Sequence, residues 1–243
     1  MSGSHSLSTS RLHLLPSFNA KTPTKTLTPT LAFAAMCSRY SLAITREELF
    51  TSFDIKHDIT TAFDYLPAYN IAPTHHVPVV TSKGLELLTW GITPWWELPK
   101  KLLFITSENL LSKSTFQNLE RCVMPLTGFY EWRDGPSGEK IPVHFSSPHH
   151  PVLGFAGIRR GNECALLTTV PSEFVSQFHT RMPSLVLPEQ TNEWITKGTP
   201  NLISDCFQDL TAWDVTTKMS NSKFQGKECT EPSPFTPIQE TLF

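Results

Sequence analysis

The run Gly128-Phe129-Tyr130-Glu131-Trp132-Arg133 is followed at once by Asp134-Gly135-Pro136. Aromatic residues favour strands, whereas Asp, Gly and Pro are typical of turns. The run therefore predicts a β-strand that ends at the turn. A second apolar stretch, Pro142 to Phe145, follows the turn and predicts another strand.

Similar patterns extend outward in both directions. His75 to Thr81 and Leu85 to Trp90 are apolar runs divided by Ser82-Lys83-Gly84, which predicts a β-hairpin. Thr45 and Glu48 have the spacing of a capping box, which predicts the start of a helix. Further short strands are expected over 153–158, 165–170 and 184–187, and short helices over 114–120 and 189–195. The pattern predicts one α+β domain with a curled, mainly antiparallel sheet and short peripheral helices.

The composition is that of an ordinary globular protein, with 243 residues, 39% hydrophobic and 17% charged. No apolar run approaches the roughly 20 residues of a transmembrane helix, so we expect no membrane span. The net charge of −2 gives no overall attraction to nucleic acid, so a polyanion site must come from local basic residues. The five cysteines lack CxxC or CxxH spacing, which argues against a disulfide framework and a zinc site. We expect no metal, no cofactor and a reducing compartment.

Residues 1–35 differ from the rest because they contain no acidic residue and many hydroxyl side chains. Their basic residues are Arg11, Lys21 and Lys25. This composition resembles an organelle transit peptide, and the alternative is a translated upstream stretch with Met36 as the working start. We expect a disordered or removed leader over 1–35, one domain over 36–230 and a flexible tail over 231–243. The expected localisation is nuclear or organellar, and otherwise cytoplasmic.

Cys37 follows Met36 directly, so it becomes N-terminal if that methionine is removed. It then carries an α-amine and a thiol on neighbouring carbons. Such a 1,2-aminothiol adds to an aldehyde through the amine, giving an imine, and then through sulfur, closing a five-membered thiazolidine. The alternative is that Cys37 is a small hydrophobic residue entering a strand.

Five short motifs occur in a fixed order along the chain. They are Met36-Cys37-x-Arg39-Tyr40, Tyr69-Asn70-Ile71-Ala72-Pro73-Thr74, Trp90-Gly91-x-x-Pro94-x-Trp96, Arg121-Cys122-x-x-Pro125-x-x-Gly128-Phe129-Tyr130-Glu131-Trp132 and His179-x-Arg181-Met182-Pro183. Together they resemble the SRAP family, the SOS-response-associated peptidase fold, from residue 36 to about residue 231. The resemblance implies a single SRAP-like domain that crosslinks to abasic sites in single-stranded DNA, and we expect a monomer.

The resemblance implies that Cys37, Glu131 and His179 are catalytic. An abasic site is a sugar whose C1′ opens to an aldehyde, so its capture needs an amine, a thiol and groups that transfer protons. Glu131 lies among aromatic residues, which would partly desolvate its carboxyl group. Histidine is the side chain that titrates nearest neutrality. The alternatives are a strand glutamate that pairs with a surface lysine, and a core histidine that orients its loop.

The resemblance also implies residues that hold DNA. Arg39, Asn70 and Arg181 would contact the strand, because a guanidinium group matches phosphate geometry. Trp95 and Trp96 would stack or wedge where a base is missing, and such stacking tolerates any sequence. The residues implied to support the site are Thr168 and Glu108.

Two departures from the family pattern affect the expected activity. The family usually carries Asn-Ala-Arg-x-Glu after the tryptophan loop, where the asparagine orients the cysteine and the arginine helps to hold DNA. Here the stretch is Phe104-Ile105-Thr106-Ser107-Glu108, so only the glutamate is kept. Asn109 would replace the asparagine only in a rebuilt loop. Ser38 also replaces the usual glycine. Reduced DNA affinity, slower crosslinking and loss of catalysis all remain open.

Three functions remain open from the sequence. The first is a covalent abasic-site crosslinking protein, and the second is a thiol autopeptidase in which Cys37, Glu131 and His179 release the leader. The third is a binding module for single-stranded or damaged DNA without chemistry. The tail Gln239-Glu240-Thr241-Leu242-Phe243 resembles half of a sliding-clamp-binding peptide, but it lacks the terminal aromatic pair, which favours a frayed tail.

Overall fold

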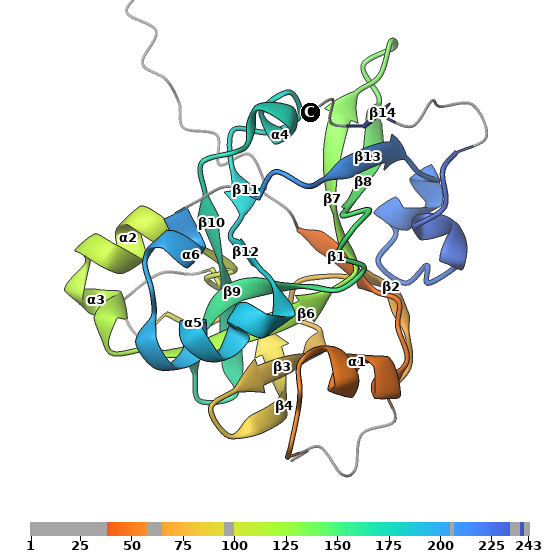
Figure 1. Ribbon diagram of the computed structural model, residues 1–243. Coiled ribbons are helices and arrows are strands. Elements are labelled where there is room, and N and C mark those ends of the chain that lie inside the picture. The colour runs from red at the N-terminus through yellow and green to blue at the C-terminus, as the bar shows by residue number, and fades with distance from the viewer. Residues whose placement is uncertain (1–37, 58–64, 95–99, 205–206, 234–238, 241–243) are drawn as a thin grey trace, which may run out of the picture. The chain divides into compact units, whose positions relative to one another are not determined.

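The computed structural model describes residues 38–57, 65–94, 100–204, 207–233 and 239–240 (Figure 1). The strands are β1 (Arg39–Leu42), β2 (Ala68–Ile71), β3 (His76–Thr81), β4 (Gly84–Trp90), β5 (Phe104–Thr106), β6 (Glu120–Leu126), β7 (Gly128–Asp134), β8 (Lys140–Ser146), β9 (Leu153–Arg160), β10 (Glu163–Thr169), β11 (Met182–Pro183), β12 (Leu185–Val186), β13 (Thr211–Asp214) and β14 (Gln239–Glu240). The α-helices are α1 (Arg46–Ser52), α2 (Ser107–Ser112), α3 (Ser114–Gln117), α4 (Glu173–Ser176), α5 (Thr191–Lys197) and α6 (Asn201–Ser204). The 3₁₀ turns are η1 (Pro188–Gln190), η2 (Thr217–Ser220) and η3 (Lys227–Cys229).

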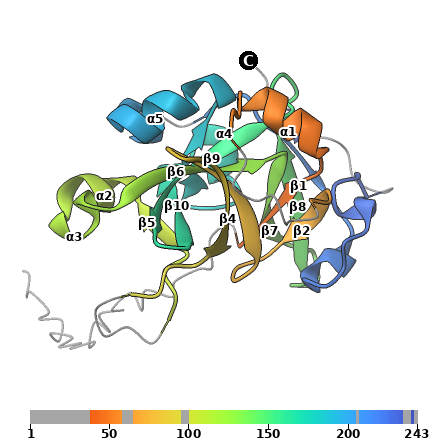
Figure 2. The same cartoon turned by 90° about the horizontal axis from the view of Figure 1, so that it is seen from below.

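The strands form two sheets. One has the order β14-β13-β8-β7-β1-β2, and the other has the order β11-β10-β4-β3-β6-β9-β12 with β5 beside β10. Pairing is antiparallel except where β10 runs parallel to β4 and β5. Short helices lie at the periphery, with α1 and α5 on one side of the strands and α2 and α3 at one end (Figure 2). The predicted α+β class with a mainly antiparallel sheet is confirmed.

Local sequence signals account for several of these elements. At the start of α1, Thr45 Oγ1 accepts the N–H of Glu48 and the Glu48 carboxylate accepts the N–H of Thr45, so the capping box is confirmed. The predicted hairpin is β3 and β4, and Gly84 at their turn has φ +119°, a conformation that favours glycine. The elements that were not predicted include β5, α2 and α4.

Buried aromatic side chains fix the position of β1. Tyr40 is fully buried, and its ring lies edge-on to Trp90 and Phe155 at centroid distances of 5.5 and 5.3 Å. Successive residues of a strand point to opposite faces. Burying Tyr40 in the core therefore directs its neighbour Arg39 toward the other side of the sheet.

The edge strand β2 is covered by a side chain instead of another strand. Oε1 of Gln225 accepts the N–H groups of Tyr69 and Asn70 at 3.2 and 3.1 Å, and its Nε2 donates to the carbonyl of Asn70 at 2.8 Å. One amide side chain thus satisfies three backbone groups of this edge.

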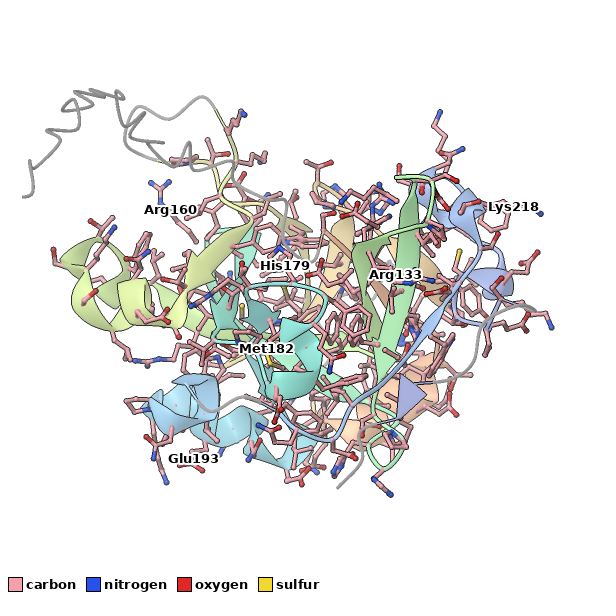
Figure 3. The ribbon with its side chains drawn as sticks, turned by 90° about the horizontal axis from the view of Figure 1, so that it is seen from above. Arg133, Arg160, His179, Met182, Glu193 and Lys218 are labelled. Carbon is pink, nitrogen blue, oxygen red and sulfur yellow. The ribbon has the colours of Figure 1, made fainter. Side chains whose placement is uncertain are left out.

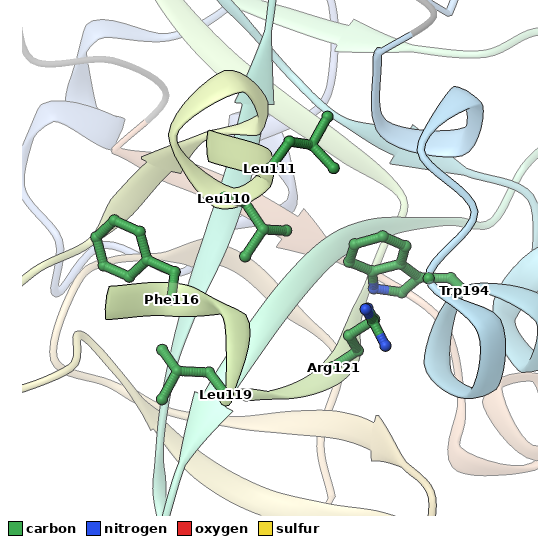
Figure 4. A pocket seen from close by; sticks show the side chains of 7 residues that line it. Leu110, Leu111, Phe116, Leu119, Arg121 and Trp194 are labelled. Atoms are coloured by element: carbon green, nitrogen blue, oxygen red, sulfur yellow. The ribbon is translucent and has the colours of Figure 1, made fainter. Parts of the chain in front are cut away.

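A hollow of about 180 Å³ lies between α2, α3 and α5 (Figure 4). It contains Arg121 of the fourth motif, whose guanidinium carbon lies 5.6 Å from the centre of the Trp194 ring. Gly198 ends α5 with φ +63°, and a Cβ atom there would lie 2.1 Å from Cζ of Arg121. Arg121 therefore packs across the C-terminus of α5, where a cation interacts favourably with the helix dipole.

The ends of the chain are described only in part. The predicted leader over 1–35 lies outside the described residues. Within the tail that was expected to be flexible from residue 231, Gln239–Glu240 forms β14 and pairs with β13. In the described parts of the chain, no helix has the length and apolar character required to span a membrane.

His144 on β8 is a buried histidine that sequence analysis did not single out. Its ring lies between Tyr130 and Trp213, with centroid distances of 4.9 and 5.2 Å, and its Nε2 lies 3.2 Å from Oγ of Ser41. A Cβ atom at Gly128 would lie 2.3 Å from that nitrogen, so the packing requires glycine there. Burial lowers the pKa of His144 to about 3.

We predict that this histidine makes the fold sensitive to acid. The unfolded chain binds a proton at His144 below about pH 6.5, whereas the folded protein does not until about pH 3. The unfolded state thus binds more protons in this window, so stability falls as the pH is lowered from 6.5 toward 3. Between pH 7 and pH 5 the free energy of unfolding should fall by about 2 kcal/mol from this group, measured by urea denaturation.

His144→Gln is the matched variant, because glutamine does not titrate there and can still bond Ser41. The pH dependence between 7 and 5 should become shallower in this variant. His75, whose pKa is lowered by burial and by Arg39, is present in both proteins and contributes equally to both slopes. An equal slope in the wild type and the variant would contradict the assignment to His144.

Candidate functional site

A cleft of about 590 Å³ lies between the β7–β8 hairpin and the segment after α4. Arg133 of β7 and His179, both labelled in Figure 3, belong to its wall. The lining residues are Ser38, Arg39, Glu131, Trp132, Arg133, Asp134, Lys140, Gln177, Phe178 and His179. The cleft therefore brings together Glu131 and His179 with Ser38, the residue that follows Cys37. Cys37, Trp95 and Trp96 lie outside the described residues.

Glu131 is held in the middle of the sheet. It lies on β7, where its backbone pairs with Val143 of β8, while the preceding Tyr130 pairs with Arg39 of β1. Its side chain is 2% exposed although it lines the cleft. A carboxyl group at the buried end of a cleft is shielded from bulk water, which suits the transfer of a proton to or from a bound molecule.

His179 is positioned by the short helix α4 and by the chain that follows it. Its N–H donates to the carbonyl of Val175 at 3.0 Å, and the N–H of Arg181 donates to its Nδ1 at 3.1 Å. Nδ1 also lies 3.1 Å from the carbonyl oxygen of Arg181, so the backbone of Arg181 can hold this nitrogen in either tautomer of the ring. Within the described part of the chain, Nε2 is buried and has no hydrogen-bond partner. This nitrogen is therefore available to a bound molecule.

Arg39 and Asn70 belong to one buried network. Nη1 of Arg39 donates to Oδ1 of Asn70 at 3.3 Å and to the carbonyl of Met219 at 3.0 Å, and burial lowers the pKa of Arg39. Nδ2 of Asn70 lies 2.8, 3.1 and 3.0 Å from the carbonyl oxygens of Met219, Asn221 and Phe224. Because Asn70 is fully buried, we assign it a positioning role in place of the predicted DNA contact.

Arg181 forms a two-pronged ion pair with Glu108. Nη1 and Nη2 each lie 2.8 Å from one carboxylate oxygen of Glu108, and Nη2 also donates to the carbonyl of Thr168 at 2.7 Å. The hydrogen bond from Arg181 holds the pKa of Glu108 at about 2. Oγ1 of Thr168 is buried and unpaired among the described residues. The predicted supporting residues Thr168 and Glu108 thus contact Arg181.

The stretch Phe104-Ile105-Thr106-Ser107-Glu108, which departs from the expected motif, packs against the core and caps a helix. Phe104 lies on β5 beside β10, and its ring lies edge-on to Trp90 at a centroid distance of 6.1 Å. Thr106 caps α2, because its Oγ1 accepts the N–H of Asn109 at 3.2 Å. An aromatic packing residue and a helix cap therefore occupy the positions at which the resemblance implies asparagine and arginine.

Sequence analysis missed several lining residues of the cleft. Nε of Arg133 donates to Asp214 at 2.9 Å, and Nζ of Lys140 lies 2.6 Å from the carboxylate of Asp134. Lys140 faces Asp134 in the antiparallel register of β7 and β8. The turn predicted at Asp134-Gly135-Pro136 could have revealed this pair, since a hairpin returns the chain beside itself.

Comparison with known proteins gives one family match. Residues 36–222 match the model of the family described as SOS response associated peptidase (SRAP). The abasic site processing protein YoqW of Bacillus subtilis is 27% identical over 223 residues, covering 81% of this chain and 99% of that protein. The abasic site processing protein HMCES of Gallus gallus is 27% identical over 226 residues, covering 69% of this chain and 67% of that protein.

Two solved structures resemble the fold. A protein from Bacteroides thetaiotaomicron superposes with a TM-score of 0.67 at 17% identity, covering 81% of this chain and 100% of that one. A phage-related protein from Bordetella bronchiseptica superposes with a TM-score of 0.58 at 20% identity, covering 74% and 95%. At these identities the likeness concerns the fold alone.

Proposed function

The chain belongs to the SOS response associated peptidase (SRAP) family, and we propose that it processes abasic sites in single-stranded DNA by forming a covalent link through Cys37. The proposal is supported by the names of its relatives, abasic site processing proteins from a bacterium and a bird. The observation that carries it is the cleft in which Ser38, next to Cys37, lies with the buried Glu131 and with His179.

The proposed chemistry needs the α-amine of Cys37 to be free. The amine adds to the C1′ aldehyde of the opened sugar, and loss of water gives an imine. The thiol sulfur then adds to the imine carbon, its proton passes to nitrogen, and the ring closes as a thiazolidine. Ring opening, loss of water and ring closure each move a proton, which Glu131 and His179 would transfer.

Release of the preceding residues would generate that amine. In the proposed autopeptidase step, the Cys37 thiol adds to the carbonyl of Met36, and the amide nitrogen leaves with a proton, giving a thioester. Water then hydrolyses the thioester, which frees the thiol and a fragment ending at Met36. The same proton-transfer groups, Glu131 and His179, serve this step.

A second candidate function is binding of single-stranded or damaged DNA without covalent chemistry. It is favoured by Phe104 and Thr106, which replace the asparagine and arginine of the family pattern and are committed to packing and capping. It is also favoured by the ion pair that occupies Arg181. This candidate predicts salt-sensitive binding and no adduct.

The test is the intact mass of protein expressed from the full reading frame, before and after incubation with a single-stranded oligonucleotide that bears one abasic site. We expect a mass that begins at Cys37 and a heat-stable adduct with the oligonucleotide. If the amine is blocked as expressed, a chain made to begin at Cys37 is the second sample. Failure of that chain to form an adduct would overturn the covalent function and leave the binding function.

A further inference from the structure

The ion pair between Arg181 and Glu108 bears on how DNA enters the site. Arg181 contacts two functional segments at once, because its N–H bonds Nδ1 of His179 and its Nη2 bonds the carbonyl of Thr168. Its side chain is 21% exposed, whereas that of Glu108 is 57% exposed. The arginine is thus the fixed partner of the pair, and the glutamate reaches it from the solvent side.

The two terminal nitrogens of the Arg181 guanidinium group are engaged by the ion pair and by one backbone carbonyl. A guanidinium group has five N–H donors, arranged so that two of them can bind one carboxylate or phosphate. Nη2 uses both of its hydrogens, on Glu108 and on Thr168, and Nη1 uses one on Glu108. The face that would bind a phosphate through two parallel bonds is therefore filled by the carboxylate.

Electrostatics favours retention of this pair in the free protein. The arginine keeps the pKa of Glu108 at about 2, so the carboxylate remains ionised at neutral pH. Its charge offsets that of Arg181, which reduces the attraction of this position for a polyanion. An ion pair with one side exposed to water is nonetheless weak, so another anion can replace it.

Resting on the proposed function, we propose that Glu108 is an internal competitor for DNA, which occupies the phosphate-binding face of Arg181 until a backbone phosphate displaces it. The carboxylate and the backbone phosphate each present two anionic oxygens that can accept hydrogen bonds from the same two nitrogens. Glu108 therefore sets the affinity and the salt dependence of strand binding, without contacting the reacting sugar.

The test is binding of fluorescently labelled, undamaged single-stranded DNA, so that no covalent step contributes. Glu108→Gln should bind about fivefold more tightly than the wild type at low salt. Its log affinity should also fall more steeply with log salt, by about 0.7, because one more phosphate is neutralised. Glu231→Gln is the matched control, since Glu231 is 51% exposed like Glu108 but pairs with Lys227 instead of Arg181.

The double variant Glu108→Gln/Arg181→Ala tests whether Glu108 competes with DNA for Arg181 itself. The alternative is that removing any negative charge strengthens DNA binding. The gain in affinity for single-stranded DNA that Glu108→Gln produces should vanish when Arg181 is replaced by alanine. The proposal is overturned if Glu108→Gln binds no more tightly than Glu231→Gln, or if the gain persists without Arg181. If the wild type neither binds this DNA nor forms an adduct with an abasic oligonucleotide, the proposed function fails as well. If the wild type does both, only the role of Glu108 is rejected.

Discussion

Replacing Cys37 with alanine is expected to abolish the heat-stable adduct with abasic single-stranded DNA. Alanine at an exposed N-terminus still offers an amine, but it has no sulfur to close the ring, so any imine remains open to hydrolysis. The measurement is denaturing electrophoresis of chains that begin at residue 37, after incubation with the abasic oligonucleotide. A heat-stable adduct of the alanine variant in wild-type yield would exclude the thiazolidine.

Cys37→Ser provides a sharper control. Serine keeps the amine and the size of the side chain but replaces the nucleophilic sulfur with a hydroxyl. With borohydride present, the serine and alanine chains should both be trapped as reduced imines, which shows that DNA still reaches the site. Without borohydride neither should survive heating. Loss of trapping in both variants would instead assign Cys37 a role in binding.

Replacing Glu131 with glutamine is expected to slow adduct formation by about 10²- to 10⁴-fold, the range that general acid–base catalysis contributes. Glutamine has the same shape, but it cannot exchange a proton during ring opening or imine formation. Because Glu131 is 2% exposed, water cannot readily take over this role. The measurement is the single-turnover rate of adduct formation with a chain that begins at Cys37.

Two controls accompany this variant. Glu47→Gln makes the same chemical change on the exposed surface of α1, and its rate should equal that of the wild type. The affinity for undamaged single-stranded DNA should be unchanged in Glu131→Gln, since the substitution removes proton transfer and leaves the shape of the side chain. A rate within threefold of the wild type would remove Glu131 from the mechanism.

Much of the local structure could be predicted because its signals are local. The capping box of Thr45 and Glu48 lies within one helical turn, and the hairpin of β3 and β4 is marked by two apolar runs about Gly84. The strand that carries Glu131 ends near the turn at Asp134. The family motifs predicted Glu131 and His179, which line one cleft.

Long-range contacts were beyond sequence reasoning. Asn70 carries a motif but is buried, because segments about 150 residues later supply the carbonyl groups that it bonds. The pairing of Arg181 with Glu108 depends on how β5 and α2 lie beside β10, and neither element was predicted. The burial of His144 likewise depends on Trp213 of β13. In each case the partner is set by sheet topology.

The amide of Gln225 on the edge of β2 also bears on whether another strand can add to this edge. An exposed edge strand offers unpaired N–H and C=O groups to which a second chain can add as a further strand, the route to intermolecular β-augmentation and amyloid-like assembly. Here the N–H groups of Tyr69 and Asn70 and the carbonyl of Asn70 are already bonded. A single glutamine thereby closes this edge to an incoming strand.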